Sequence, residues 1–169
     1  MREITVKTYP VGPSFSTPEE AIAHSFAYPP LLQARADWEL VRGSQFVDAW
    51  WTDEDFVIRF SNEKFLHVFV DAEAGRNIRW RVLATEPVIG GAGIERVGSP
   101  AVLLNFSRAG PYVMDRSALV TARRGRDVTQ FFVNEVSFYV YTPRQLILTF
   151  GVAYRADNGR NLLYVCEDR

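Results

Sequence analysis

The chain has 169 residues and a formal net charge of -1, with 47% hydrophobic and 14% aromatic residues. A chain of this length and apolar content can bury one substantial core, which excludes a disordered protein and predicts a single domain over residues 1–169. Its near-zero charge provides no overall field to recruit nucleic acid or an anionic membrane, so we expect neither as a partner.

The cysteine content and the apolar runs bear on location. Cys166 is the single cysteine of the chain, so an intramolecular disulfide is excluded. The opening residues MREITVKTYP lack the apolar stretch of a signal peptide. The longest apolar runs fall short of the ~20 residues that cross a bilayer. We therefore expect a cytoplasmic protein without a membrane span.

The N-terminal third is expected to contain a strand over 3–9 and a helix over 18–27. The run STPEEAIAHSFAYPP carries a capping threonine, a proline suited to the first helical position and a glutamate three residues after the cap. Pro29 and Pro30 are expected to end this helix. The segment LLQARAD is a candidate for a short second helix before Trp38.

From residue 38 to about residue 82 the apolar pattern has a period of two. The segments QFVDAWW, FVIRF, FLHVFV and NIRWRVL are short and rich in aromatic and β-branched residues, which predicts an antiparallel meander. The glycines and prolines of EPVIGGAGIERVGSP predict a loop, and AVLLNF predicts a further strand.

The C-terminal third is expected to form a helix over 116–124 and three strands. Asp115 is suited to cap the helix and Gly125 to end it. The strands are predicted in FFVNEVSFYVY, QLILTFGVAY and NLLYVCE. The complete order predicts an α+β domain, in which two helices cover part of a twisted, mainly antiparallel sheet of eight or nine strands.

Two stretches repeat the order Gly-Arg-Asn, at 75–77 and at 159–161. Each follows a predicted hairpin, FVIRFSNEKFLHVFV or SFYVYTPRQLILTFG, so the chain contains two similar meanders. Good turn residues recur independently, and we favour convergence over duplication. Arg76 and Arg160 are either exposed turn residues, which we favour, or a pair of anion-binding side chains.

His67 is the candidate catalytic residue. In a hairpin that turns at Asn62-Glu63 it stands opposite Ile58 on a face lined by phenylalanines. A desolvated imidazole with a carboxylate partner can act as a general base. The aligned position in the second hairpin is Leu148, and we therefore favour a histidine that is part of the core.

Trp50 and Trp51 are predicted binding residues, together with Arg76 and Arg160. Consecutive residues of a strand point to opposite faces, so we expect one tryptophan to be partly exposed and to contribute to a platform for a partner.

Two groups of charged residues have both a functional and a structural interpretation. An acidic run has the oxygens that a hard cation prefers, but alternating side-chain directions favour a solvated turn, and we predict no metal site. A basic patch is suited to a phosphate or an acidic partner, although such residues at a helix end usually face water. The acidic run is Asp48, Asp53, Glu54 and Asp55, and the patch is Arg116, Arg123, Arg124 and Arg126.

The sequence contains no motif for a nucleophile elbow, a phosphate-binding loop, a zinc site or a dinucleotide site. We therefore predict no cofactor. Strands that are apolar on both faces, such as FLHVFV, need cover on both sides. The first hypothesis is thus a non-catalytic module that binds a protein partner or self-associates. The alternative is a small hydrolase or isomerase that uses His67 and a carboxylate in an aromatic-lined cleft.

Overall fold

A computed structural model describes residues 1–9, 29–73, 77–90, 93–107, 109–134 and 137–168 of the chain. These residues form twelve strands, two α-helices and one 3-10 turn. One sheet contains β1 (Arg2–Thr8), β7 (Val102–Phe106), β8 (Gly110–Met114), β9 (Gln130–Val133), β10 (Ser137–Thr142), β11 (Leu146–Arg155) and β12 (Asn161–Asp168). The other sheet contains β2 (Phe46–Trp51), β3 (Asp55–Phe60), β4 (Phe65–Val70), β5 (Ile78–Leu83) and β6 (Glu95–Arg96). The helices are α2 (Pro29–Glu39) and α3 (Arg116–Arg123), and the 3-10 turn is η1 (Pro143–Gln145).

The strand order is β8-β7-β1-β11-β10-β9 in the seven-stranded sheet, where β12 also pairs with β11, and β5-β4-β3-β2-β6 in the other. The α+β class and the mainly antiparallel pairing are confirmed. The prediction of one sheet of eight or nine strands is wrong, because there are two sheets and the larger is mixed: β1 runs parallel to β7.

Three strands account for the difference in number. The two-residue β6 lies inside the segment predicted as a loop. β8 begins with Gly110-Pro111, residues more typical of a turn. The segment FFVNEVSFYVY divides into β9 and β10, where the Asn134 side chain accepts a hydrogen bond of 2.8 Å from the Ser137 amide and turns the chain.

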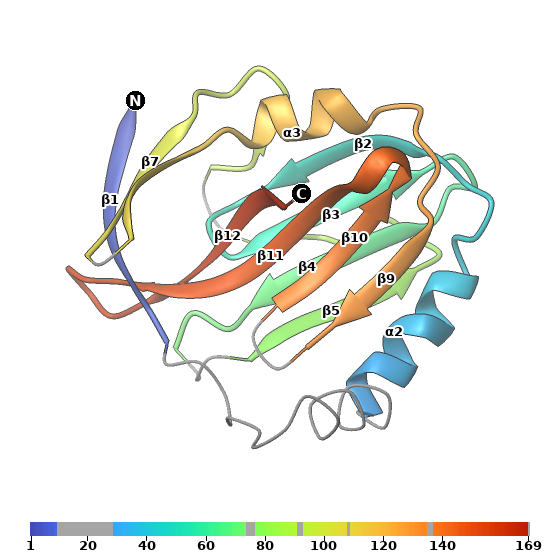
Figure 1. Ribbon diagram of the computed structural model, residues 1–169, viewed down its shortest axis with the longest axis horizontal. Helices are drawn as coiled ribbons and strands as arrows, with labels where there is room; N and C mark the ends of the chain where they lie inside the picture. Colours follow the sequence, from blue (N-terminus) through green and yellow to red (C-terminus); the bar gives the residue numbers. More distant parts are fainter. Residues whose placement is uncertain (10–28, 74–76, 91–92, 108, 135–136, 169) are drawn as a thin grey trace.

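Two four-stranded meanders, β2 to β5 and β9 to β12, face each other across the core. Figure 1 shows β9, β10 and β11 over β3, β4 and β5, with α2 and α3 at different edges. Aromatic rings join the sheets: Phe56 lies 5.1 Å from Phe150, and Trp80 lies 5.0 Å from Phe138, between ring centroids. Burial of these large rings is the main source of stability for such a sandwich.

The two described helices confirm part of the helix prediction. α3 begins after Asp115, whose side chain accepts a 3.0 Å hydrogen bond from the Ala118 amide, as expected for a cap. Pro29 and Pro30 begin α2, since proline is well suited to a first helical turn, and α2 contains the segment LLQARAD, which confirms the second helix expected there. The helix predicted over 18–27 lies outside the described residues.

The β3–β4 hairpin has a different register from the predicted one. Its turn contains three residues, 61–63, between Phe60 and Lys64, and Glu63 has a positive φ of 63°. His67 consequently pairs with Val57, and the predicted pairing with Ile58 is wrong. A shift of one residue moves a side chain to the other face of a sheet. His67 therefore points away from the core.

The second Gly-Arg-Asn stretch is in the β11–β12 turn and contacts the residues after β4, whereas Gly75 and Arg76 lie outside the described residues. The Asn161 backbone amide donates to Ala72 O at 2.9 Å, and its side-chain amide donates to Asp71 O at 2.8 Å. Gly159 adopts the expected positive φ, 70°. The aligned hairpins nevertheless present their residues differently, since Leu148 points into the core and His67, its counterpart, points outward.

We expect Gly151→Ala to destabilise the protein, because the Tyr164 ring lies directly over Gly151. A Cβ atom at Gly151 would lie 2.2 Å from Tyr164 Cζ. Overpacking of this kind costs about 1–3 kcal/mol. Urea unfolding measures the effect, with Gly90→Ala as a matched control, since a Cβ there meets no atom within 4 Å. The cost must shrink in a Tyr164→Ala background, and an equal cost there contradicts this explanation.

Candidate functional site

Both candidate tryptophans are buried, with exposed fractions of 5% for Trp50 and 1% for Trp51. Trp51 stacks on Phe56 in the core. Trp50 points to the outer face of the five-stranded sheet, where Ile89, from the segment after β5, packs on it. The expectation that one tryptophan is partly exposed is wrong, because this segment crosses the outer face and covers Trp50.

The candidate arginines lie in different environments. Arg160 is in the β11–β12 turn and forms an exposed 3.5 Å ion pair with Glu73. Arg76 lies outside the described residues. The basic patch predicted around the second helix does not form as a surface, because Arg116 and Arg123 are buried, with exposed fractions of 3% and 0%.

His67 is buried between two charged side chains on the outer face of β4. Its Nε2 lies 2.7 Å from Asp55 Oδ1, and Arg81 Nε donates a 3.1 Å hydrogen bond to its Nδ1. The ring stacks on Phe69 with centroids 4.6 Å apart. Asp55, which follows the β2–β3 turn, is thus the carboxylate partner that the sequence does not identify.

These contacts assign the proton of the imidazole. A guanidinium has donors and no acceptor, so Nδ1 of His67 must be unprotonated to accept from Arg81. The proton is therefore on Nε2, which donates to Asp55. The lone pair that a general base needs is occupied by Arg81 in this structure.

Thr52 extends the same chain of contacts. Its hydroxyl donates a 3.0 Å hydrogen bond to Asp55 Oδ2. The order is therefore hydroxyl, carboxylate, imidazole, whereas an activated nucleophile needs the imidazole next to the hydroxyl. The catalytic role of His67 remains a prediction, now with Asp55 as its carboxylate.

The outer face of the five-stranded sheet carries a group of arginines that the sequence reasoning did not single out. Direct cross-strand pairing places Arg81, His67, Val57, Trp50 and Arg96 in one row across all five strands. We call this surface the arginine face. Its four arginines, none of which forms an ion pair with a described residue, are Arg59, Arg79, Arg81 and Arg96.

The alternation of side-chain directions along the segment IRWRVL predicts which residues of β5 lie on the arginine face. Trp80 points into the core, where it contacts Phe138, so the flanking Arg79 and Arg81 point outward. Both arginines are exposed. The identity of the other strands that share their face follows only from the register of the sheet.

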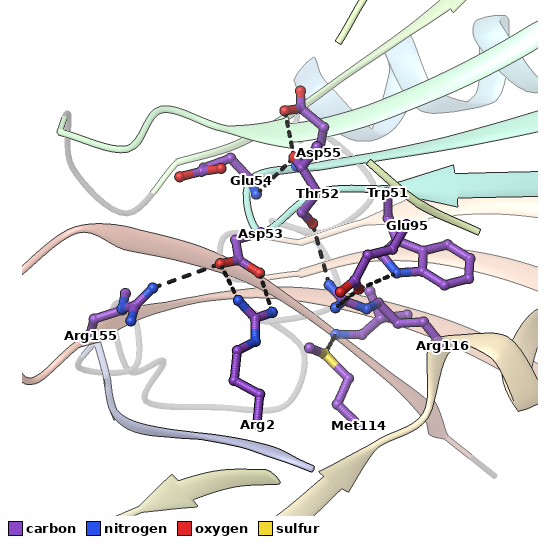
Figure 2. Close-up of polar contacts among 11 residues, drawn as sticks. Arg2, Trp51, Thr52, Asp53, Glu54, Asp55, Glu95, Met114, Arg116 and Arg155 are labelled. Atoms are coloured by element: carbon purple, nitrogen blue, oxygen red, sulfur yellow. Dashed lines mark hydrogen bonds and ion pairs between the residues drawn. The ribbon is translucent and has the colours of Figure 1, made fainter. Parts of the chain in front are cut away.

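The turn between β2 and β3 distributes its acidic side chains to different partners. Figure 2 shows Asp53, Glu54 and Asp55 pointing in different directions, as alternation predicts. Asp53 receives two hydrogen bonds from Arg2, of 2.7 and 3.1 Å, and lies 3.7 Å from Arg155. This carboxylate therefore links β1 and β11 to the other sheet.

A second ion pair lies beside this turn and is less exposed. Arg116 donates to Glu95 Oε2 at 2.9 Å and to the Thr52 carbonyl at 3.3 Å, and Trp51 Nε1 donates to the same Glu95 oxygen at 3.0 Å (Figure 2). Burial lowers the pKa of Arg116, and the charge of Glu95 opposes this effect. The pair joins β6 to the start of α3.

A cavity of about 330 Å³ opens between these ion pairs, lined by Arg2, Thr52, Asp53, Glu54, Gly90, Gly93 and Glu95. No side chain among the described residues donates a hydrogen bond to the Glu54 carboxylate, which interacts with the backbone of Glu54 itself. Burial, followed by the negative charge of Asp53, raises the pKa of Glu54. The ionised form of Glu54, which lines this cavity, is therefore destabilised in the folded protein.

Among the described residues, no group of three or more histidine, cysteine, aspartate or glutamate side chains is placed to hold a metal ion. In the same residues, no helix combines the length and the apolar character needed to cross a membrane. Comparisons of the chain with family models, curated proteins and solved structures gave no match.

We expect Glu95→Gln to destabilise the fold by about 2 kcal/mol or more, because it leaves the charge of the buried Arg116 without its partner. Glu73→Gln is the matched control, since it removes an exposed ion pair, and it should change stability by less than about 0.5 kcal/mol. Chemical unfolding of both variants at one pH measures the difference. Equal effects would contradict a stabilising role for the Arg116 pair.

We expect Glu54→Gln to stabilise the protein at pH 7. Since the folded protein holds the Glu54 proton more tightly than the unfolded chain, stability is lost as the pH rises through the raised pKa. The gain from Gln should disappear well below pH 4.5, the ordinary value, where Glu54 is protonated in both states. Thermal unfolding across this range tests the prediction, with the exposed Glu86→Gln as a control. A gain that persists in acid contradicts it.

Proposed function

We propose that this protein is a non-catalytic binding module and that the arginine face binds an acidic segment of a protein partner. The observation that carries the proposal is the absence of ion pairs at Arg59, Arg79, Arg81 and Arg96 within the described part of the chain. Arginine is also among the residue types enriched at the centres of protein interfaces.

Four arginines without an ion pair to a described residue lie together on this face. Elsewhere, Arg2, Arg116 and Arg124 each have a carboxylate within hydrogen-bonding distance. The arginine face thus presents guanidinium groups that a carboxylate from outside can pair with. Like charges on one face repel weakly, and a bound anion relieves this repulsion.

Arg79 and Arg81 are exposed on β5, the strand at one edge of this face. They are two residues apart on β5, so their side chains leave the strand on the same side with origins about 6.6 Å apart. An extended segment with an acidic residue at every second position has the same spacing. Guanidinium and carboxylate groups form paired hydrogen bonds, which favours this partner chemistry.

The overall charge favours an acidic protein segment over nucleic acid. At a net charge of -1, the chain lacks the broad positive field that supplies most non-specific affinity for phosphate backbones. A local group of arginines is sufficient for a short acidic segment, where pairing geometry contributes more than long-range attraction.

The hydrolase or isomerase alternative has one supporting observation, the 2.7 Å contact between His67 and Asp55. An imidazole with a carboxylate partner is typical of general bases. We rank this alternative second, because Arg81 occupies the imidazole nitrogen that would accept a proton.

The test measures binding of a fluorescent Glu-Ser repeat peptide by anisotropy. We expect the wild type to bind, and Arg79→Gln/Arg81→Gln to weaken binding about tenfold or more, because two charge-assisted contacts are lost. Binding should also weaken between about 50 and 200 mM salt.

Arg126→Gln/Arg144→Gln is the matched control, since it removes the same charge from the half-buried Arg126 and the exposed Arg144, both outside the arginine face. It should bind like the wild type. Equal loss in both double variants, or no binding by the wild type, contradicts the proposal. Tighter binding of oligothymidylate than of the peptide replaces the acidic segment with nucleic acid as partner.

A further inference from the structure

We propose that His67 is a positioning residue for this binding site: its unprotonated Nδ1 holds the Arg81 guanidinium so that the two terminal nitrogens face a bound carboxylate. The inference rests on the proposed function, because it concerns the same face. It also makes binding dependent on the protonation of His67.

Arg81 is held at two points. Its Nε donates to His67 Nδ1 at 3.1 Å, and its Cζ lies 5.6 Å from the centre of the Phe69 ring. The two terminal nitrogens of Arg81 form no hydrogen bond with a described residue. A guanidinium fixed through its inner edge loses less conformational entropy when its outer edge binds a ligand.

His67 is itself held in place by Asp55, on the side of the ring opposite Arg81. Its ring is 4% exposed and is bonded to Asp55, whose other carboxylate oxygen accepts the Thr52 hydroxyl. A chain of contacts therefore runs from Thr52 through Asp55 and His67 to Arg81. Nothing equivalent holds Arg79, which makes no polar contact with a described residue. Arg81 is the preorganised member of the pair.

Protonation of His67 removes this support. Once Nδ1 carries a proton, it faces the Nε–H of Arg81 with a donor and a like charge. The charged groups that face the imidazole are Asp55 from β3 and Arg81 from β5. Arg79 is the next charged residue along β5, and β4 has no titratable residue besides His67.

The expected result is weaker binding in acid. Histidine charge changes in the range from pH 5 to pH 8. Because Asp55 is already bonded to the ring and offsets its charge, loss of the Arg81 orientation is the larger effect. We expect the affinity of the wild type for the Glu-Ser repeat peptide to fall about fivefold from pH 8 to pH 5, the worth of one modest hydrogen bond.

Two substitutions separate positioning from general structure. His67→Asn keeps an oxygen acceptor near the place of Nδ1 and does not titrate, so it should bind like the wild type at pH 8 and show no fall at pH 5. His67→Leu removes the acceptor and should bind about fivefold more weakly at both values. A fall for His67→Asn that equals the wild-type fall overturns the inference, because the titration then belongs to the peptide or to another group.

A measurement on the unmodified protein keeps the inference testable if His67→Leu fails to fold. Nitrogen NMR at pH 8 should show the imidazole protonated at Nε2 and a coupling through the hydrogen bond between Arg81 Nε and His67 Nδ1. The coupling and the signal of an unprotonated Nδ1 should disappear together as the pH falls, while Nε2 keeps its proton. A ring protonated at Nδ1 at pH 8 overturns the inference.

The two proposals fail in different ways. If the arginine double variant loses the peptide while His67→Asn keeps the wild-type pH profile, the binding face stands and the role of His67 is rejected. If the arginine double variant binds like the wild type, the proposed function is rejected, and the NMR spectra alone decide whether His67 orients Arg81.

Discussion

The three-residue turn at 61–63 determines which side of β4 meets the core. With Phe60 and Lys64 on either side of it, Leu66 and Val68 point inward and are fully buried. A turn of two residues would bring the opposite set to the core, including the imidazole of His67. The residues of β5 that face outward also depend on this register, since β5 pairs with β4.

In this register, the apolar residues and the ion pairs occupy separate parts of the sandwich. Inward residues build the aromatic contacts between the sheets, such as Phe56 with Phe150. At the end of the sandwich near the β2–β3 turn, carboxylates from the five-stranded sheet meet arginines of β1, β11 and α3. These ion pairs are partly shielded from water and link the two sheets, which gives them more weight than surface pairs.

The outer face contains charges of a different kind. Arg81 and Arg96 lie on aromatic rings, over Phe69 and Trp50, and are held there without a carboxylate partner among the described residues. Rings of this kind support a guanidinium through its flat side and leave its edges available. This arrangement supports the proposal that the arginine face binds carboxylates.

The sequence by itself determined the α+β class, the cap of α3 and the alternation within single strands, because these depend on local propensity and on the period of two. It did not determine the number of strands, since β6 and β8 form only where a neighbouring strand supplies hydrogen bonds. Only the tertiary structure placed Asp55, His67 and Arg81 together, because this depends on the register of three strands. It also decided the burial of Trp50, since the segment that covers this ring comes from a distant part of the chain.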